Sequence, residues 1–141
     1  MSQDIFCQIS KKEAAAFIVY EDDLILGFLD REPFSRFHTL LIPKRHAETI
    51  EEMTESELQR VMTVAKKMTS IFRKKMGYPS VTILQNNGKA QDVSHFHLHV
   101  IGKKERDAPL YFKTFQNLEE RERHLSEDAK ELTEAVQNLD I

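Results

Sequence analysis

Short apolar runs alternate with charged segments in the N-terminal third of the chain, and this pattern predicts three β-strands. Residues 17–20 and 24–29 are rich in β-forming side chains and flank an acidic segment, as in a hairpin with a charged turn. Residues 30–37 contain a proline and several charges and predict a loop. A third strand is expected over residues 39–42, where Pro43 ends it because proline donates no hydrogen bond to a neighbouring strand.

The apolar spacing changes to three and four residues after Thr54, which predicts one long helix. Thr54 and Glu57 have the spacing of a capping box, in which a hydroxyl and a carboxylate satisfy free backbone N–H groups at a helix start. Gly77 and Pro79 predict its end. The apolar face is expected to pack on a sheet and to bury both of its methionines, because methionine at this spacing usually fills gaps in a core. That face comprises Leu58, Val61, Met62, Ala65, Met68 and Phe72.

Two further strands and a second helix are expected in the rest of the chain. Residues 81–84 and 95–101 have the composition of strands and are separated by the turn-forming segment Asn86-Asn87-Gly88. A narrow apolar stripe predicts a C-terminal helix over about residues 118–139, for which Ser126 is a candidate cap. With about five strands, one long helix and a C-terminal helix, the sequence predicts an α+β fold with an antiparallel sheet.

Length and composition favour one globular domain. The 141 residues are enough for a single core, and 40% hydrophobic with 30% charged residues argue against disorder. We expect one domain over residues 1–141, with its core in residues 4–103 and a C-terminal extension. Lys and Arg number 20 against 23 Asp and Glu, so the net charge is −3 and the long-range attraction to nucleic-acid polymers and anionic membranes is missing.

Counts of glycine, apolar residues and cysteine exclude further classes of protein. Four glycines leave no place for a glycine-rich phosphate loop or a dinucleotide-binding motif. The longest apolar run, Ala14–Tyr20, is far shorter than the ~20 residues that span a bilayer, and the N-terminus lacks the layout of a signal peptide. The single cysteine, Cys7, cannot form an internal disulfide, as expected in a reducing compartment. These features predict a cytoplasmic protein.

Three histidines at alternate positions give the strongest chemical signal. In a strand, His95, His97 and His99 present their imidazoles on one face, and the apolar residues between them face the other way. One interpretation is a three-histidine metal site with an open position for water. Same-face neighbours on a strand lie ~6.6 Å apart, however, which hinders convergence on one ion. The favoured interpretation is phosphoryl or nucleotidyl transfer, with the central imidazole as nucleophile and its neighbours orienting it and stabilising charge.

The segment from His95 to Ile101 resembles the signature of the histidine triad (HIT) family, His-φ-His-φ-His-φ-φ, in which φ is apolar. The resemblance continues upstream in unbroken order and covers roughly residues 4–103. It is strongest with the small nucleoside phosphoramidase branch, and it implies a HIT-like sheet with one long helix packed on it. The upstream matches are residues 4–7, 20–23, 28–30, 38–46, 86–88 and 91–93.

The resemblance implies a role for each histidine of the cluster. His97 would be the nucleophile that becomes transiently nucleotidylated. His99 would hydrogen-bond the α-phosphate and assist departure of the leaving group, and His95 and His38 would orient the cluster. Asp30 would accept hydrogen bonds from the ribose hydroxyls.

The resemblance also implies positions that hold the rest of the nucleotide. Three apolar residues would line the base pocket: Phe6, Ile9 and Phe28. Three polar residues would hold the phosphate: Asn86, Gln91 and Asp92. Asp92 departs from the Ser or Thr of many relatives, and an ionised carboxylate repels a phosphate unless it is protonated or turned away. Arg31 departs too, because it stands at an apolar position of the base pocket.

A cysteine motif of some bacterial relatives bears on metal binding. In those relatives, a Cys-x-x-Cys segment and two histidines matching His46 and His95 form a structural zinc site. Here Asp4 replaces the first cysteine and Cys7 is the second. Aspartate, cysteine and two histidines can still bind zinc tetrahedrally. Because one of the two thiolates is missing, we expect a metal-free protein that requires no cofactor, with a structural zinc less favoured and Cys7 as a small buried residue.

These residues together predict a hydrolase that cleaves purine nucleoside phosphoramidates or related nucleotide conjugates through a nucleotidyl-His97 intermediate. Two alternatives stay open: a nucleotide-binding or scaffold protein with weak residual catalysis, and a diadenosine polyphosphate hydrolase. The expected partner is a small purine nucleotide, and the resemblance implies a homodimer whose sheets join across the two-fold axis. We expect neither a nucleic-acid polymer nor a membrane as a partner.

Overall fold

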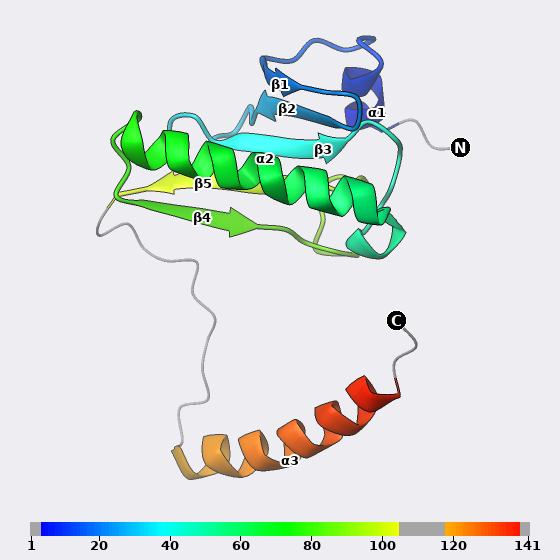
Figure 1. Ribbon diagram of the computed structural model, residues 1–141, viewed down its shortest axis with the longest axis vertical. Coiled ribbons are helices and arrows are strands. Elements are labelled where there is room, and N and C mark those ends of the chain that lie inside the picture. Colours follow the sequence, from blue (N-terminus) through cyan, green and yellow to red (C-terminus); the bar gives the residue numbers. More distant parts are fainter. Residues whose placement is uncertain (1–3, 105–117, 139–141) are drawn as a thin grey trace. The chain divides into compact units, whose positions relative to one another are not determined.

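The computed structural model describes residues 4–104 and 118–138, and the chain falls into two compact units, Met1–Asp107 and Ala108–Ile141. The first unit holds a five-stranded sheet with helices on both faces (Figure 1). The second unit holds one long helix, α3 (Leu118–Gln137), which confirms the predicted C-terminal helix. Within the described residues, no helix has the length and apolar character needed to cross a membrane.

All five strands run antiparallel to their neighbours in one open sheet, which confirms the predicted architecture. The strand order is β1-β2-β3-β5-β4, so β1 and β4 form the two free edges. The strands are β1 (Ile18–Glu21), β2 (Ile25–Leu29), β3 (Thr39–Pro43), β4 (Ser80–Leu84) and β5 (Leu98–Lys103).

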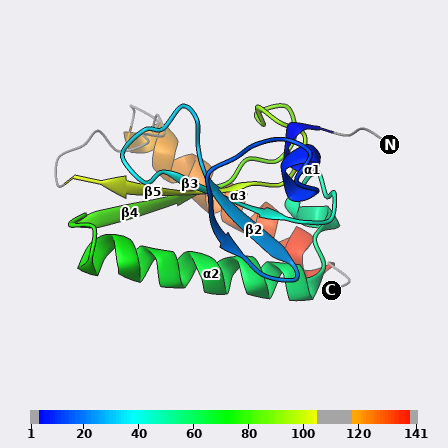
Figure 2. The same cartoon turned by 90° about the horizontal axis from the view of Figure 1, so that it is seen from above.

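The long helix α2 (Glu55–Lys74) lies along one face of the sheet (Figures 1 and 2). Its predicted capping box is present. The Thr54 hydroxyl accepts a hydrogen bond from Glu57 N at 3.1 Å, and Glu57 Oε1 accepts one from Thr54 N at 2.9 Å. The same buried carboxylate pairs with Arg45 at 2.8 Å, so the start of the helix is fixed by its own cap and by the loop before it.

The structure contains two short helices that the sequence pattern does not predict. Helix α1 (Ile5–Ser10) lies at the sheet face opposite α2 (Figure 2), and the 3-10 helix η1 (Ile50–Glu52) precedes α2. Asp4 caps α1 by accepting a hydrogen bond from Cys7 N at 2.7 Å. Helices of 6 and 3 residues are too short to show a helical periodicity in the sequence.

The sheet separates two apolar cores. One core lies between the sheet and α2 and buries Ile25, Leu41 and Val61 among others. The other core packs Phe6 of α1 against Phe28 of β2 and its neighbours. Both faces of this sheet are therefore covered by helices, and the face that carries α1 is the one on which the histidines gather.

Two helical positions differ from the sequence prediction. Met62 is 50% exposed, so its assignment to the core is wrong. It follows the buried Val61 directly and so lies about 100° away around the helix, outside the buried stripe. Met68 does pack against the core. Ser126 lies inside α3 and is not its N-cap.

Strand β5 is shorter than predicted at its N-terminal end. It begins at Leu98, so His95 and His97 precede the strand and only His99 lies within it. The preceding segment is held from outside the sheet, because Phe96 N donates to the Ala47 carbonyl at 2.7 Å. The three histidines therefore do not form a simple row on one strand, and each is positioned by its own contacts.

Candidate active site

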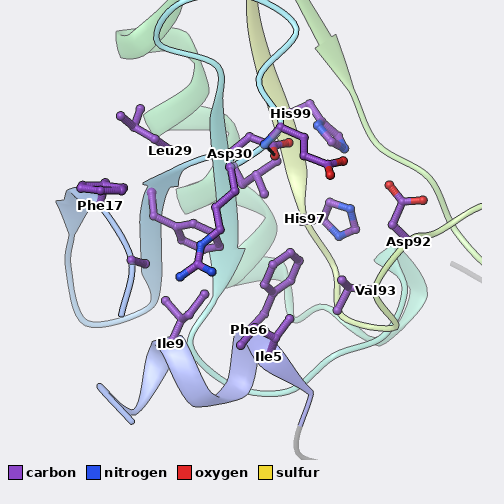
Figure 3. Close-up of a pocket in the computed structure, with 15 residues that line it drawn as sticks. Ile5, Phe6, Ile9, Phe17, Leu29, Asp30, Asp92, Val93, His97 and His99 are labelled. Atoms are coloured by element: carbon purple, nitrogen blue, oxygen red, sulfur yellow. Dashed lines mark hydrogen bonds between the residues drawn. The ribbon is translucent and has the colours of Figure 1, made fainter. Parts of the chain in front are cut away.

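A cavity of about 290 Å³ opens at the sheet face that carries α1 (Figure 3). It is bounded by α1, by β2 and the loop after it, and by the segment from Asp92 to His99. The predicted site residues that line it are Phe6, Ile9, Phe28, Asp30, Asp92, His97 and His99. The cavity thus brings the apolar positions assigned to a base together with two of the histidines.

Other lining residues were not singled out from the sequence. Several of them directly adjoin a predicted site residue in the chain, which is the signal that points to them: Ile5, Leu29, Glu32 and Val93. Ala16, Phe17 and Leu40 gave no such signal. Arg31 also lines the cavity, and its guanidinium donates to the Ala15 carbonyl at 3.0 Å. This arginine is therefore tied to the chain that leads into β1.

Four predicted site residues do not line the cavity. Two of them, His38 and His95, hold lining residues in place through contacts described below. Gln91 Nε2 donates to the Glu48 carbonyl at 2.7 Å, and its Oε1 accepts from the backbone of its own loop, so its amide holds that loop together. Asn86 lies in the same connection between β4 and β5. The structure does not bring Asn86 and Gln91 into the cavity wall.

His97 is held in one orientation and one tautomer by the backbone. Its Nδ1 lies 2.7 Å from the His95 carbonyl oxygen. A carbonyl only accepts, so Nδ1 carries the proton and the lone pair of the neutral ring is on Nε2. The ring is buried, with its centroid 5.1 Å from that of Phe6 and 5.1 Å from that of His99. A neutral imidazole with a free Nε2 is the state that a nitrogen nucleophile requires.

A chain of hydrogen bonds also fixes the tautomer of His99. Phe34 N donates to His38 Nδ1 at 3.0 Å, so the proton of the neutral His38 ring is on Nε2. His38 Nε2 lies 2.9 Å from His99 Nδ1 and donates to it. His99 therefore carries its own proton on Nε2. The cavity wall thus holds an N–H donor on His99 beside the lone pair of His97.

The surroundings keep the imidazole rings of His38 and His99 neutral. Burial, together with the neighbouring His97 and His38, lowers the pKa of His99 to about 4, and the carboxylates of Asp30 and Asp92 oppose this shift only in part. Burial also lowers the pKa of His38, against the attraction of Asp30, whose Oδ2 lies 3.5 Å from His38 Nε2. A proton added to His99 Nδ1 would face the N–H of His38. At neutral pH, His99 is therefore a fixed hydrogen-bond donor.

His95 is held by a different set of contacts from those that join His38 and His99. Its Nε2 lies 3.0 Å from the Pro43 carbonyl and donates to it, so Nδ1 is the unprotonated nitrogen. That lone pair faces Asp4 Oδ1 at 3.2 Å and the Cys7 sulfur at 3.5 Å. His46 Nδ1 joins the group, 3.0 Å from Asp4 Oδ2. Burial lowers the pKa of His95, so two acceptors face each other unless a proton or a cation lies between them.

The residues around His95 fit a zinc ion. One donor atom from each of Asp4, Cys7, His46 and His95 lies within 4.8 Å of all the others. Carboxylate oxygen, thiolate sulfur and imidazole nitrogen are all zinc ligands, and four of them suit a tetrahedral site. An ion there would tie α1 to the loop after β3 and to the histidine segment.

The three histidines of the motif do not converge on one ion. Within residues 4–104 and 118–138, no group of converging donor atoms contains two of them. His95 belongs to the cluster with Asp4, and His99 to a group with Asp30 and His38 in which the two imidazoles are joined directly by a hydrogen bond. The geometry therefore favours the nucleophile interpretation over the three-histidine metal site.

Comparisons with known proteins agree with this geometry. Residues 11–106 match the model of a family described as HIT domain. An adenylylsulfatase from Arabidopsis thaliana is 38% identical over 105 residues, which cover 73% of this chain and 53% of that protein. An adenosine 5'-monophosphoramidase from Saccharomyces cerevisiae is 35% identical over 108 residues, which cover 75% of this chain and 66% of that protein. The crystal structure of a HIT family member from Bacillus subtilis matches with a TM-score of 0.80 at 27% identity and covers 99% of both chains.

Proposed function

Because the chain belongs to the HIT-domain family, we propose that it is a nucleotide hydrolase that cleaves purine nucleoside phosphoramidates through a covalent intermediate on His97. The observation that carries this proposal is the tautomer of His97, whose Nε2 lone pair is free in a cavity shared with the N–H donor of His99. The relatives named as a phosphoramidase and an adenylylsulfatase support hydrolysis at a nucleotide phosphorus.

The first step transfers the nucleotidyl group to the protein. His97 Nε2 forms a bond to phosphorus while the bond from phosphorus to the leaving group breaks, and the leaving group keeps that electron pair. His99 donates its Nε2–H to a phosphoryl oxygen and stabilises the charge that develops there. His97 keeps its Nδ1–H bond to the His95 carbonyl, which stabilises the positive charge on the substituted ring.

The second step releases the nucleotide. A water molecule attacks phosphorus, loses a proton to solvent, and displaces His97, whose Nε2 regains its electron pair. Two displacements at phosphorus return the free enzyme and a nucleoside monophosphate. The same hydrogen bond from His99 serves both steps, because His38 keeps His99 in the donor tautomer throughout.

The cavity also supports a place for the nucleoside. Phe6 and Phe28 pack edge to face with ring centroids 5.4 Å apart, and Ile9 lies beside them in the same core. These side chains offer an apolar pocket for a purine base on the α1 side of His97 (Figure 3). Asp30 directly follows β2, lines the same cavity, and offers an acceptor for the ribose hydroxyls.

Removing the Asp30 carboxylate tests the ribose assignment. In the Asp30→Ala variant we expect affinity for adenosine monophosphate to fall about tenfold, because a buried hydroxyl loses its charged acceptor. Affinity for the 2'-deoxy analogue is expected to change less, since it lacks one of the hydroxyls. Titration calorimetry with both nucleotides measures the difference. Equal losses for the two sugars would place Asp30 outside the ribose site.

We also propose a homodimer in which two sheets join through their β4 edges. The β1 edge is protected, because it is short, carries a bulge, and ends at Glu21, which pairs with Lys12 and Lys44 at 2.7 Å each. The β4 edge, Ser80–Leu84, has no charged side chain and exposes 41% of Ile83. An uncharged, exposed strand edge is suited to pairing with a second copy.

Light scattering is expected to give twice the 16.5 kDa mass of the chain. The Ile83→Lys variant is expected to shift the protein to the monomer mass at micromolar concentration, because it places a charge at the proposed interface. Ile18→Lys on the β1 edge is the matched control, since Ile18 is exposed to nearly the same extent, 40%. A monomeric wild type, or the same effect from both variants, would rule out a β4 interface.

We propose that turnover requires no metal, because imidazole replaces metal-bound hydroxide as the nucleophile. If zinc occupies the cluster of Asp4, Cys7, His46 and His95, its contribution is to hold the fold. After exhaustive chelation, kcat is expected to stay within about twofold of its starting value wherever the protein remains folded. The unfolding temperature is followed in parallel, and metal content is checked by elemental analysis. Folded, metal-free protein that regains turnover only with an added divalent ion would contradict the proposal.

A further inference from the structure

The carboxylate of Asp92 lines the cavity at its solvent-exposed side and has no partner among the residues that the structure describes. It lines the cavity together with His97 and His99. Among residues 4–104 and 118–138, no hydrogen bond or ion pair engages this carboxylate, although its charge acts on His99. In Figure 3, His97 lies between Phe6 on one side and Asp92 on the other. Asp92 is therefore on the side of the nucleophile away from the proposed base pocket, where the leaving group has to be.

A carboxylate is unsuited to hold the phosphate itself. It offers no donor to phosphoryl oxygens and repels their charge, and the donor they need is already present on His99 Nε2. Two further carboxylates, Asp30 and Glu32, line the same cavity, so the acidic side chains of the lining outnumber its one guanidinium, that of Arg31, three to one. The cavity therefore disfavours a second anionic group beyond the phosphate that reacts.

An amine leaving group needs an extra proton, and this proton does not come from His99. When a bond from phosphorus to nitrogen breaks, the nitrogen has to carry an extra proton to leave as a neutral amine. His99 cannot supply that proton at neutral pH, because its Nδ1 faces the N–H of His38 and the ring stays neutral. The proton therefore comes from water before the bond breaks, and the nitrogen is positively charged at that moment.

We infer that Asp92 binds the protonated nitrogen of the leaving group and thereby selects amine leaving groups over anionic ones. The inference rests on the proposed function, and it assigns to position 92 a role other than phosphate binding. The nitrogen takes a proton from solvent, which the attacking water of the second step later returns, and pairs with the Asp92 carboxylate. His97 Nε2 then bonds to phosphorus, and the electron pair of the phosphorus–nitrogen bond goes to the nitrogen, which leaves as a neutral amine.

The test compares two substrates that share the adenosine 5'-phosphoryl group. One is adenosine 5'-phosphoramidate, with an amine leaving group, and the other is adenylyl sulfate, with an anionic one. In the Asp92→Asn variant, which keeps the shape and removes the charge, we expect the ratio of kcat/KM for amine over sulfate to fall about tenfold. Asp23→Asn, which removes a charge outside the cavity lining, is the control and leaves the ratio unchanged.

The pH dependence of the rate with adenosine 5'-phosphoramidate is a second test, and it does not require turnover of adenylyl sulfate. The rate depends on the fraction of substrate with a protonated nitrogen, and a nearby carboxylate raises the pKa of that nitrogen. We therefore expect the profile of Asp92→Asn to shift to lower pH relative to wild type. An unchanged profile overturns the inference, as does an unchanged substrate ratio wherever both substrates react.

The two proposals fail in different ways. If the wild type turns over neither substrate, the hydrolase proposal fails before Asp92 is tested. If the wild type turns over the phosphoramidate and Asp92→Asn behaves like it, only the role of Asp92 is lost. Nucleotide binding by Asp92→Asn, measured with adenosine monophosphate, shows whether the variant keeps its cavity intact.

Discussion

Replacing His97 with alanine is expected to abolish turnover. We expect kcat to fall by at least about a thousandfold, because the variant lacks the only side chain that forms a bond to phosphorus in the proposed reaction. Affinity for adenosine monophosphate should change little, since the bond from His97 exists only along the reaction path. Steady-state kinetics and calorimetry on the same preparation separate the two effects.

His124→Ala is the matched control, because it removes a histidine from the separate C-terminal unit. Its kcat is expected to stay close to that of the wild type. The nucleophile assignment would not survive a His97→Ala variant that keeps more than a few per cent of wild-type kcat. Loss of both turnover and nucleotide binding would indicate a collapsed cavity, and circular dichroism with a thermal melt identifies that case.

Removing His38 is expected to have the second-largest effect. Without its N–H, His99 Nδ1 loses the donor that fixes its tautomer, and the Nε2–H of His99 is no longer assured. We expect kcat of His38→Ala to fall by about 10²-fold, the scale of one lost donor at a phosphoryl or oxyanion site. His38→Asn is the conservative partner, because its amide can still donate, and it is expected to keep more of the activity.

The pH behaviour of His99 separates positioning from a general loss of structure. In the wild type its pKa is lowered to about 4, so the ring stays neutral while the same residue in the unfolded chain is protonated below its ordinary value of 6.5. The unfolded state then binds more protons, so this group's contribution to stability is complete above pH 6.5 and is lost as the pH falls toward 4. In His38→Ala the pKa is expected to rise, because a neighbour that opposed protonation is gone. An NMR titration that leaves the midpoint of His99 unchanged would contradict the proposed hydrogen-bond chain.

The fold could be predicted from the sequence wherever local signals were strong. The capping box at Thr54 fixed the start of α2, and β-forming runs placed the hairpin and the third strand close to their observed positions. Helix α1 has only 6 residues and no readable periodicity, so it escaped prediction. Met62 was misplaced because the true buried stripe is narrow, and spacing alone cannot locate its border.

Seven of the residues that line the cavity could be named from the sequence, but the contacts that hold them could not. The three alternate histidines stood out, yet the strand begins only at Leu98, so a period of two did not position His95 and His97. The rings of His95 and His99 are held by groups distant in the sequence, whereas His97 is held by the His95 carbonyl two residues earlier. The Pro43 carbonyl binds His95, and His38 binds His99 across 61 positions. Contacts of this kind depend on how the strands pair, and no spacing in a single sequence reveals them.

Trapping the covalent intermediate tests the proposed reaction most directly. Wild-type protein is mixed with adenosine 5'-phosphoramidate, quenched in alkali within one turnover because bonds from phosphorus to histidine are labile in acid, and analysed by intact mass and peptide mapping. We expect a mass increase of one adenylyl group, located on His97 and absent from His97→Ala. Turnover by the wild type with no adduct at any time, or an adduct on another residue, would contradict the proposed reaction.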